Sequence, residues 1–105
     1  VRAGEVMVSR IQLLSKIIEP AKRLGVQLQL RGPANLQGFL DASGEFLFTD
    51  VNLRFGSGVL HTIHAGGNIP EMLIKELLGQ PIETKPSFVK DGSTMSRFHD
   101  AIFDF

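Results

Sequence analysis

The sequence predicts a single α+β domain in which an antiparallel sheet packs with two main helices. Three observations support this prediction. Apolar side chains recur at helical spacing in two separate segments, strand-like runs flank the turn DASG at residues 41–44, and 43% of the 105 residues are hydrophobic. A chain of this length is typical of one domain, so we expect residues 1–105 to fold as one unit.

The N-terminal part predicts a strand followed by a helix. Residues 1–9 alternate between apolar and polar side chains, as a strand does. Ser9 is then a candidate N-cap, and Gly25 is a candidate left-handed residue at the C-terminal end of the first helix. Pro20 lies inside this helix and predicts a bend. The apolar positions that recur at helical spacing are Ile11, Leu14, Ile17, Ile18, Ala21 and Leu24.

The middle of the chain predicts a hairpin. Residues 26–52 contain two or three strand-like runs, and the turn at 41–44 separates the last two. If Leu40 pairs with Glu45, strand alternation gathers polar side chains of both strands on one face. In that register Asn35 lies opposite Asp50, Gln37 lies opposite Phe48, Asn52 and Arg54 share the face, and Phe39, Phe46 and Phe48 continue it toward the turn. A loop one residue longer or shorter would turn one strand over and separate these groups.

The C-terminal part predicts a second helix and a closing hairpin. Asn68 is a candidate N-cap, Pro70 fits the first turn, and the apolar stripe of the helix runs on toward Gly79. The segment 59–67 is ambiguous between a helix and a strand. In the tail, the runs SFVK and TMSRFH flank the turn KDGS and predict two paired strands.

The composition excludes several classes of partner. Eleven basic residues balance eleven acidic residues without a block of either sign, so we expect no nucleic acid and no membrane partner. Cysteine is absent, which excludes disulfides and thiolate catalysis and fits a cytoplasmic location. No apolar run approaches the roughly 20 residues of a membrane span. The chain begins at Val1 in a strand-like run without a methionine, which indicates that it was cut from a longer protein.

The polar residues of the predicted hairpin suit a metal and phosphate site. The side-chain oxygen atoms of Asp50, Asn52 and Gln37 are ligands that Mg²⁺ prefers. Arg54 could hold a phosphate with its planar guanidinium, and the amides of residues 56–58 could line the same cavity. An edge strand with a solvated polar face explains the same spacing, so spacing alone does not decide between the two interpretations.

Three further residues carry weaker signals. His61 and His64 lie three positions apart, but no third metal ligand follows at a recognisable spacing. We therefore interpret both as packed or surface histidines. Arg97 either approaches a cleft or decorates the tail hairpin, and the second interpretation is favoured.

The run GPANLQGFLDASGEFLFTDVNLRFGSG, followed by AGGNIPEMLIKELLGQP, resembles the C-terminal subdomain of ATP-grasp enzymes, especially the branch similar to the large chain of carbamoyl phosphate synthetase. The resemblance covers most of the chain and includes the tail pattern VKDGSTMSRF. It implies that ATP and Mg²⁺, or Mn²⁺ in its place, bind here. The implied metal ligands are Gln37, Asp50 and Asn52, and the implied nucleotide contacts are Asn35, Gln37, Arg54, Gly56, Ser57 and Gly58, with Arg54 as the catalytic residue that steadies the transferred phosphoryl group.

By the same resemblance, the parent enzyme is an ATP-dependent carbon–nitrogen ligase that phosphorylates a small carboxylate or bicarbonate. Its site lies between two subdomains, so the implied partner is the N-terminal ATP-grasp subdomain of the same chain, and the 105 residues alone are expected to be inactive. Asp50 stands where the family has a longer glutamate, and Leu53 where it has a proline. These departures keep open a degenerate, non-catalytic module used for domain or subunit contact; an unrelated binding domain is the third alternative.

Overall fold

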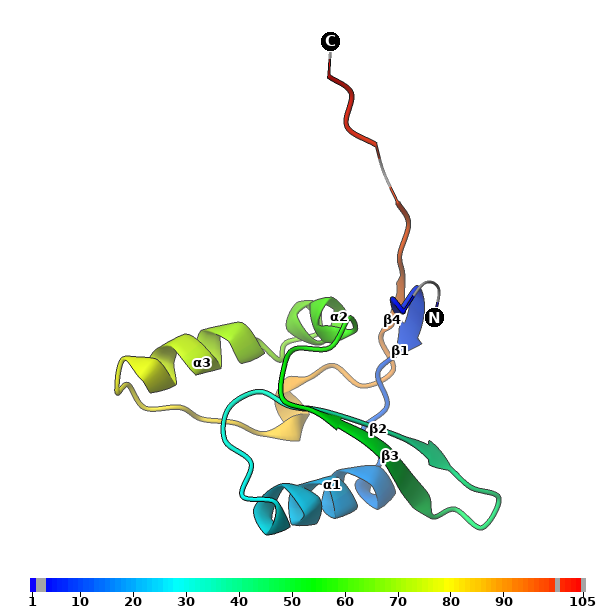
Figure 1. Ribbon diagram of the computed structural model, residues 1–105, viewed down its shortest axis with the longest axis vertical. Helices are drawn as coiled ribbons and strands as arrows, with labels where there is room; N and C mark the ends of the chain where they lie inside the picture. Colours follow the sequence, from blue (N-terminus) through cyan, green and yellow to red (C-terminus); the bar gives the residue numbers. More distant parts are fainter. Residues whose placement is uncertain (2–3, 100, 105) are drawn as a thin grey trace.

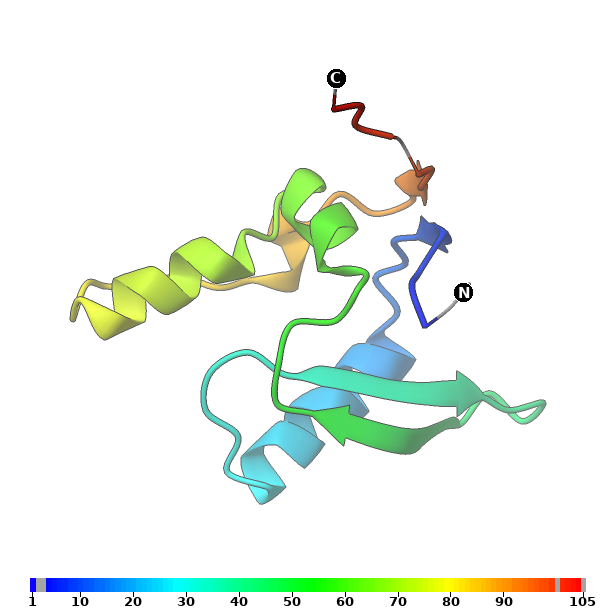
Figure 2. The same ribbon diagram turned by 45° about the horizontal axis from the view of Figure 1, so that its top comes forward.

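The computed structural model describes residues 1, 4–99 and 101–104, and it has the predicted α+β fold (Figure 1). The elements in chain order are β1 (Val8–Arg10), α1 (Ser15–Gln27), β2 (Asn35–Leu40), β3 (Phe46–Asn52), α2 (Val59–His64), α3 (Ile69–Leu77), the 3₁₀ turn η1 (Pro86–Phe88) and β4 (Thr94–Ser96). β2 pairs with β3 and β1 pairs with β4, so the strands form two small antiparallel sheets. Figures 1 and 2 show α1 against the β2–β3 hairpin, and α2 with α3 as a second group that residues 53–58 join to it.

The pairing of β4 with β1 brings the two ends of the described chain together. The predicted hairpin between residues 87–90 and β4 is therefore wrong. The reason lies in the turn before β4, which bonds to the segment after β1. The N–H of Gly92 donates to the carbonyl of Ile11, and the N–H of Ile11 donates to the carbonyl of Ser93, both at 2.8 Å. The predicted first strand shortens to β1, and its residues 2–3 lie outside the described part of the chain.

The β2–β3 hairpin forms as predicted, but two extra residues change its register. The loop spans residues 41–45, so Leu40 pairs with Phe46, whereas the prediction paired it with Glu45. A bulge in β3 then leaves Thr49 outside the pairing. Either change alone would turn one strand over. Together they shift the register by two residues, which returns the side chains beyond the bulge to their predicted face.

The bulge keeps the polar residues of the hairpin together but gives them new partners. Gln37 pairs with Asp50, and Asn35 pairs with Asn52. These pairs correct the predicted ones, in which Asn35 faced Asp50 and Gln37 faced Phe48. The predicted polar face therefore exists, although the pairing from which it was derived is wrong.

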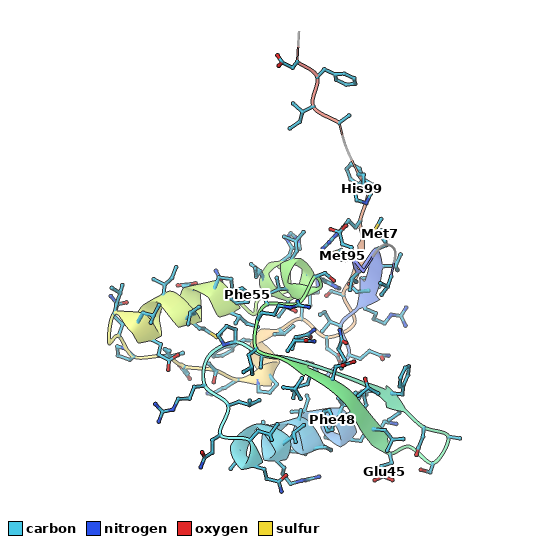
Figure 3. The ribbon with its side chains drawn as sticks, in the orientation of Figure 1. Met7, Glu45, Phe48, Phe55, Met95 and His99 are labelled. Atoms are coloured by element: carbon cyan, nitrogen blue, oxygen red, sulfur yellow. The ribbon has the colours of Figure 1, made fainter. Side chains whose placement is uncertain are left out.

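The aromatic side chains of the hairpin divide between its two faces. Phe39 shares the polar face and is 70% exposed. Phe46 and Phe48, which were predicted on that face, lie on the opposite face because they precede the bulge. Their rings meet edge to face with centroids 5.0 Å apart, and Figure 3 shows Phe48 between the hairpin and α1. The helix α1 thus covers one face of the hairpin and leaves the polar face open.

Gly38 lies beside the bulge, where a larger residue does not fit. A Cβ atom at this position would lie 2.2 Å from the carbonyl oxygen of Leu47. Because backbone must move to relieve this contact, we expect Gly38→Ala to lower the free energy of unfolding by roughly 2–4 kcal/mol. Urea denaturation of the protein measures the effect. Gly25→Ala is the control, since a Cβ atom there meets nothing within 4 Å; equal midpoints for the two variants would contradict this bulge geometry.

Asp41 organises the loop of the hairpin. Its carboxylate accepts hydrogen bonds from the hydroxyl of Ser43 at 2.6 Å and from the N–H groups of Ser43 and Glu45, each at 2.9 Å. These bonds, the Ser43 hydroxyl first, lower the pKa of Asp41 below its usual value of 3.8. A lowered carboxyl pKa means that these bonds stabilise the loop above pH 3.8 and that this stabilisation is lost as the pH falls through the lowered pKa.

We therefore expect Ser43→Ala to raise the pKa of Asp41 back toward 3.8, because it removes the largest cause of the shift. The carboxyl carbon of Asp41, followed by NMR from neutral to acidic pH, reports this change. Ser15→Ala, at the exposed start of α1, is the control. An unaltered Asp41 titration in the Ser43 variant would mean that this hydroxyl does not bond to the carboxylate in solution.

The helix α1 runs as one helix through Pro20, but both of its ends differ from the prediction. It starts later because Ser9 belongs to β1 and because Ile11 and Leu13 are bonded to the turn before β4. It also ends later. Gln29, with a φ of 53°, takes the left-handed position predicted for Gly25, and the N–H of the next residue closes onto the Gly25 carbonyl at 3.0 Å.

The second predicted helix is confirmed as α3, and the ambiguous segment 59–67 contributes the short helix α2. Asn68 caps α3 by accepting a backbone N–H at 3.2 Å, and Gly79, with a φ of 70°, follows its end. The stripe predicted to be core is only partly covered. Met72 is half-buried, whereas Leu77 is 78% exposed.

The described part of the chain has no fully enclosed hydrophobic core. None of its hydrophobic side chains is buried, and the accessible surface is 8241 Å². A compact monomer of this mass exposes roughly 5,800 Å². The radius of gyration of 15.5 Å likewise exceeds the value of about 13 Å for a compact domain of this length. Figure 2 shows the open arrangement of the elements. No helix within the described ranges is long and apolar enough to cross a membrane.

Candidate functional site

The polar face of the β2–β3 hairpin collects four oxygen-bearing side chains. Gln37 lies directly across the ladder from Asp50, and Asn35 lies across from Asn52. Gln37 and Asp50 are exposed, whereas Asn35 and Asn52 are half-buried. Within the described residues, no hydrogen bond or ion pair uses any of these four side chains. Their oxygen atoms are therefore available to a ligand.

This set of donors fits a hard cation that is bound together with phosphate. Mg²⁺ takes oxygen ligands, and it usually binds through one or two carboxylates, phosphate oxygens and water. Asp50 supplies one carboxylate, and Gln37 and Asn52 supply amide oxygens from the same face. Among residues 4–99 and 101–104, no group of three or more histidine, aspartate or glutamate side chains could hold a metal by itself. The hairpin residues thus suit Mg²⁺ or Mn²⁺ that a nucleotide helps to hold.

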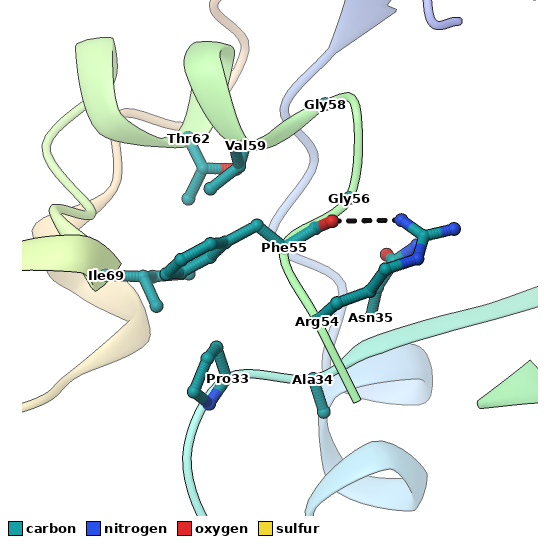
Figure 4. A pocket seen from close by; sticks show the side chains of 10 residues that line it. All are labelled: Pro33, Ala34, Asn35, Arg54, Phe55, Gly56, Gly58, Val59, Thr62 and Ile69. Carbon is teal, nitrogen blue, oxygen red and sulfur yellow. Dashed lines mark hydrogen bonds between the residues drawn. The ribbon is translucent and has the colours of Figure 1, made fainter. Parts of the chain in front are cut away.

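Arg54 borders a pocket at the end of the hairpin (Figure 4). The pocket has a volume of about 240 Å³. One N–H of the Arg54 guanidinium donates to the carbonyl of Phe55 at 3.0 Å, and the side chain is otherwise exposed. A planar guanidinium of this kind can bind phosphate oxygens with its remaining N–H groups. The pocket is lined by Pro33, Ala34, Asn35, Arg54, Phe55, Gly56, Gly58, Val59, Thr62 and Ile69.

Four of the residues predicted to contact the nucleotide therefore meet at one pocket: Asn35, Arg54, Gly56 and Gly58. Gly56 lets the Asn35 side chain approach the loop closely, because a Cβ atom at position 56 would lie 2.9 Å from the side-chain amide of Asn35 and would displace it. Gln37 lies outside the lining, next to Asp50 on the open face of the hairpin.

Ser57 also lies outside the pocket lining, on the side of the loop that faces the chain ends. Its hydroxyl oxygen accepts the N–H of Val6 at 3.0 Å, and its carbonyl accepts an N–H of Arg97 at 2.8 Å. Both acceptors are thus engaged within the protein. The prediction that Ser57 contacts the nucleotide directly stays a prediction.

Sequence reasoning missed the role of two residues near this loop. Arg97 has a side chain that is only 16% exposed, and it donates to the carboxylate of Glu5 at 2.5 Å. It therefore does not decorate the surface of a hairpin, as the sequence favoured. No local pattern could have revealed the pair, because the two residues are separated by 92 positions.

His61 is a packed histidine at the junction of β1, α2 and the turn before β4. It is 4% exposed. Nδ1 forms a hydrogen bond with the hydroxyl of Ser9 at 2.7 Å, and Nε2 forms one with the hydroxyl of Ser93 at 2.9 Å. Both ring nitrogens are therefore used inside the fold. His64 is exposed on the same short helix.

A family model that matches nearly the whole chain indicates an ATP-binding module of the ligase type, and the α+β fold is consistent with this class. The chain belongs to the family described as "ATP-grasp in the biosynthetic pathway with Ter operon", whose model matches residues 2–100. Comparisons with curated proteins and with solved structures find no match.

Proposed function

We propose that the chain is the metal- and phosphate-binding part of an ATP-dependent ligase that activates a carboxylate or bicarbonate as an acyl phosphate. The proposed enzyme is similar to the large chain of carbamoyl phosphate synthetase and acts in the cytoplasm. One observation carries the proposal: the hairpin pairs Gln37 with Asp50, and Arg54, two residues after β3, lies on the rim of a pocket. Membership of the ATP-grasp family supports it.

Each residue of the site has a separate role in this proposal. Gln37, Asp50 and Asn52 hold Mg²⁺, which neutralises charge on the phosphates of ATP when bound. Arg54 is the catalytic residue, and it donates hydrogen bonds to the oxygens of the transferred phosphoryl group. Phosphoryl transfer depends mainly on positioning and on charge stabilisation, so the protein needs no nucleophilic side chain of its own.

The reaction proceeds by two displacements. A carboxylate oxygen of the acceptor forms a bond to the γ-phosphorus of ATP, and ADP leaves with the electron pair of the broken bond. Ammonia or an amine then attacks the carbonyl carbon of the acyl phosphate and releases inorganic phosphate. The pocket beside Arg54 and the amides of Gly56 and Gly58 suit an anionic acceptor, since both glycines line it.

The proposed partner is the remainder of the same chain, an N-terminal ATP-grasp subdomain, with residues 1–105 as one C-terminal unit. Exposed apolar side chains support this partner, because Phe39 on the open face of the hairpin and Leu53 just after β3 are each 70% exposed. So does the accessible surface, which exceeds that of a compact monomer by well over the roughly 800 Å² that one partner buries in a standard interface. The 105 residues alone are therefore proposed to be inactive.

The test is the release of ADP by the full-length protein, measured with bicarbonate and a panel of small carboxylates, each with ammonia or an amine. We expect ADP only when both Mg²⁺ and an acceptor are present. The 105-residue piece assayed alone should release none. Release of ADP at the same rate with and without Mg²⁺ would contradict the assignment of the metal ligands.

One observation favours a second candidate, a degenerate module that makes domain or subunit contacts. Asp50 provides the single carboxylate of the four-residue polar face, and it is shorter than the glutamate of the similar enzymes. This candidate predicts that calorimetry detects no Mg²⁺-dependent binding of ATP to the full-length protein. Binding without turnover would instead indicate a missing acceptor.

A further inference from the structure

Two segments from opposite ends of the chain hold Ser57 from two directions. The N–H of Val6 donates to the Ser57 hydroxyl oxygen at 3.0 Å, and Arg97 donates to the Ser57 carbonyl at 2.8 Å. The β1–β4 sheet brings these segments together, and the N–H of Arg97 itself donates to the carbonyl of Met7 at 2.6 Å. Figure 3 shows Met7 and Met95 side by side at this sheet. The loop at the pocket is therefore anchored to the small sheet.

The charge of Arg97 is satisfied away from the pocket. One guanidinium nitrogen bonds to Glu5 and the other bonds to the Ser57 carbonyl, so the planar group bridges the two segments. Its side chain is 16% exposed, and Arg97 is not among the residues that line the pocket. Arg54 differs in each respect, because it is exposed and lies on the pocket rim. The two arginines thus have distinct tasks.

The bond to the Ser57 carbonyl also orients the next amide. The peptide between Ser57 and Gly58 is trans, so the N–H of Gly58 points opposite to the carbonyl that Arg97 holds. Gly58 lines the pocket and Ser57 does not. Within the described residues, the N–H groups of Gly56 and Gly58, the two loop residues that line the pocket, donate to no protein acceptor. A ligand can therefore use them.

We infer that Arg97 is a positioning residue that, with Glu5, sets the loop 56–58 so that its free amides bind the anionic acceptor or the phosphate formed from it. The inference rests on the proposed function for the identity of the ligand. Arg97 itself does not touch that ligand. Lysine at this position keeps the positive charge but has one nitrogen, so it cannot bond to the Glu5 carboxylate and the Ser57 carbonyl in the same fixed fork.

The test compares Arg97→Lys with the full-length wild-type protein. Arg10→Lys is the matched control, because Arg10 is an exposed arginine of the same small sheet. The protein is labelled with [¹⁵N]glycine and loaded with MgADP, and inorganic phosphate is titrated as the probe. The signals of Gly56 and Gly58 report the loop, and those of Gly44 and Gly79, in distant turns, serve as references.

In the wild type and in Arg10→Lys, phosphate should shift the signals of Gly56 and Gly58. In Arg97→Lys the same shift should need about tenfold more phosphate, because misplaced groups bind less well. The affinity for MgADP should change less than about twofold, since Arg97 bonds to none of the proposed metal ligands of the hairpin. Glu5→Gln should give a smaller change in the same direction.

Two results would overturn the inference. One is an unchanged phosphate midpoint in Arg97→Lys, including the case in which only the melting temperature falls, which would indicate a purely structural role. The other is a wild-type protein that binds MgADP but shows no response of Gly56 and Gly58 to phosphate. If MgADP itself does not bind, the proposed function fails. The inference is then decided by ¹⁵N relaxation of Gly58 in the free protein, where faster motion in Arg97→Lys supports the anchor and equal motion overturns it.

Discussion

If the proposed ligase function holds, replacement of Arg54 by alanine is expected to lower the proposed ATP turnover roughly 10³-fold while leaving folding intact. The loss should be large because a cationic donor at the transferred phosphoryl group acts mainly in the transition state. Folding should survive because Arg54 is exposed and its one hydrogen bond goes to the neighbouring carbonyl of Phe55. Steady-state release of ADP gives the rate, and thermal unfolding gives the stability.

Two further variants sharpen this result. Arg54→Lys keeps the charge but loses the planar fork, so we expect it to recover only part of the activity. Arg31→Ala removes an exposed arginine from the loop before β2 and should leave turnover within about twofold of the wild type. Turnover retained in Arg54→Ala would remove Arg54 from the catalytic role.

Asp50→Asn is expected to raise the Mg²⁺ concentration for half-maximal activity by roughly ten- to a hundredfold. Asp50 is the single carboxylate among the four polar residues of the hairpin face, so its replacement removes the negative charge of the protein's ligand set. The side chain is exposed and forms no hydrogen bond within the described residues, so the fold should be unaffected. Activity measured against Mg²⁺ concentration at saturating ATP tests the effect.

The chain offers a control and a reciprocal variant for this prediction. Glu45→Gln removes one negative charge from the hairpin loop just before β3 and should leave the Mg²⁺ dependence unchanged. Asp50→Glu restores the side-chain length of the similar enzymes and is expected to strengthen Mg²⁺ binding. If Asp50→Asn and Glu45→Gln shift the Mg²⁺ dependence equally, the effect is one of general charge and Asp50 is not a ligand.

Secondary-structure elements that are specified by residues close together in the sequence could be predicted. The hairpin and α3 carry local signals, such as the DASG turn, the Asn68 cap and the apolar spacing of α3, and both elements form. The C-terminal end of α1 could not be predicted from local residue preferences. Glycine is the residue that usually ends a helix in the left-handed conformation, yet Gln29 takes that conformation here and Gly25 lies inside the helix. The 41–45 loop and the Thr49 bulge carry no clear sequence signal.

The candidate site shows the same division. Its proposed ligands were predicted from strand alternation and from a family resemblance; membership of the ATP-grasp family is confirmed, and the roles of the residues stay predictions. The pairing of these residues across the hairpin was predicted wrongly, since the predicted partner of Gln37 was Phe48 and the observed partner is Asp50. The grouping survived because two insertions of one residue restore a period of two. A single insertion would have placed Asp50 on the face that α1 covers.

The sequence by itself determined which side chains are available for the proposed chemistry: a carboxylate, amides and an arginine at alternating positions before a glycine loop. The tertiary structure alone decided how the loop is held. Glu5 and Arg97 meet because β4 pairs with β1 rather than with its neighbour in sequence. That choice depends on bonds between residues far apart in the chain, such as Ile11 with Gly92 and Ser93, and a local pattern does not encode which distant backbone groups will satisfy one another.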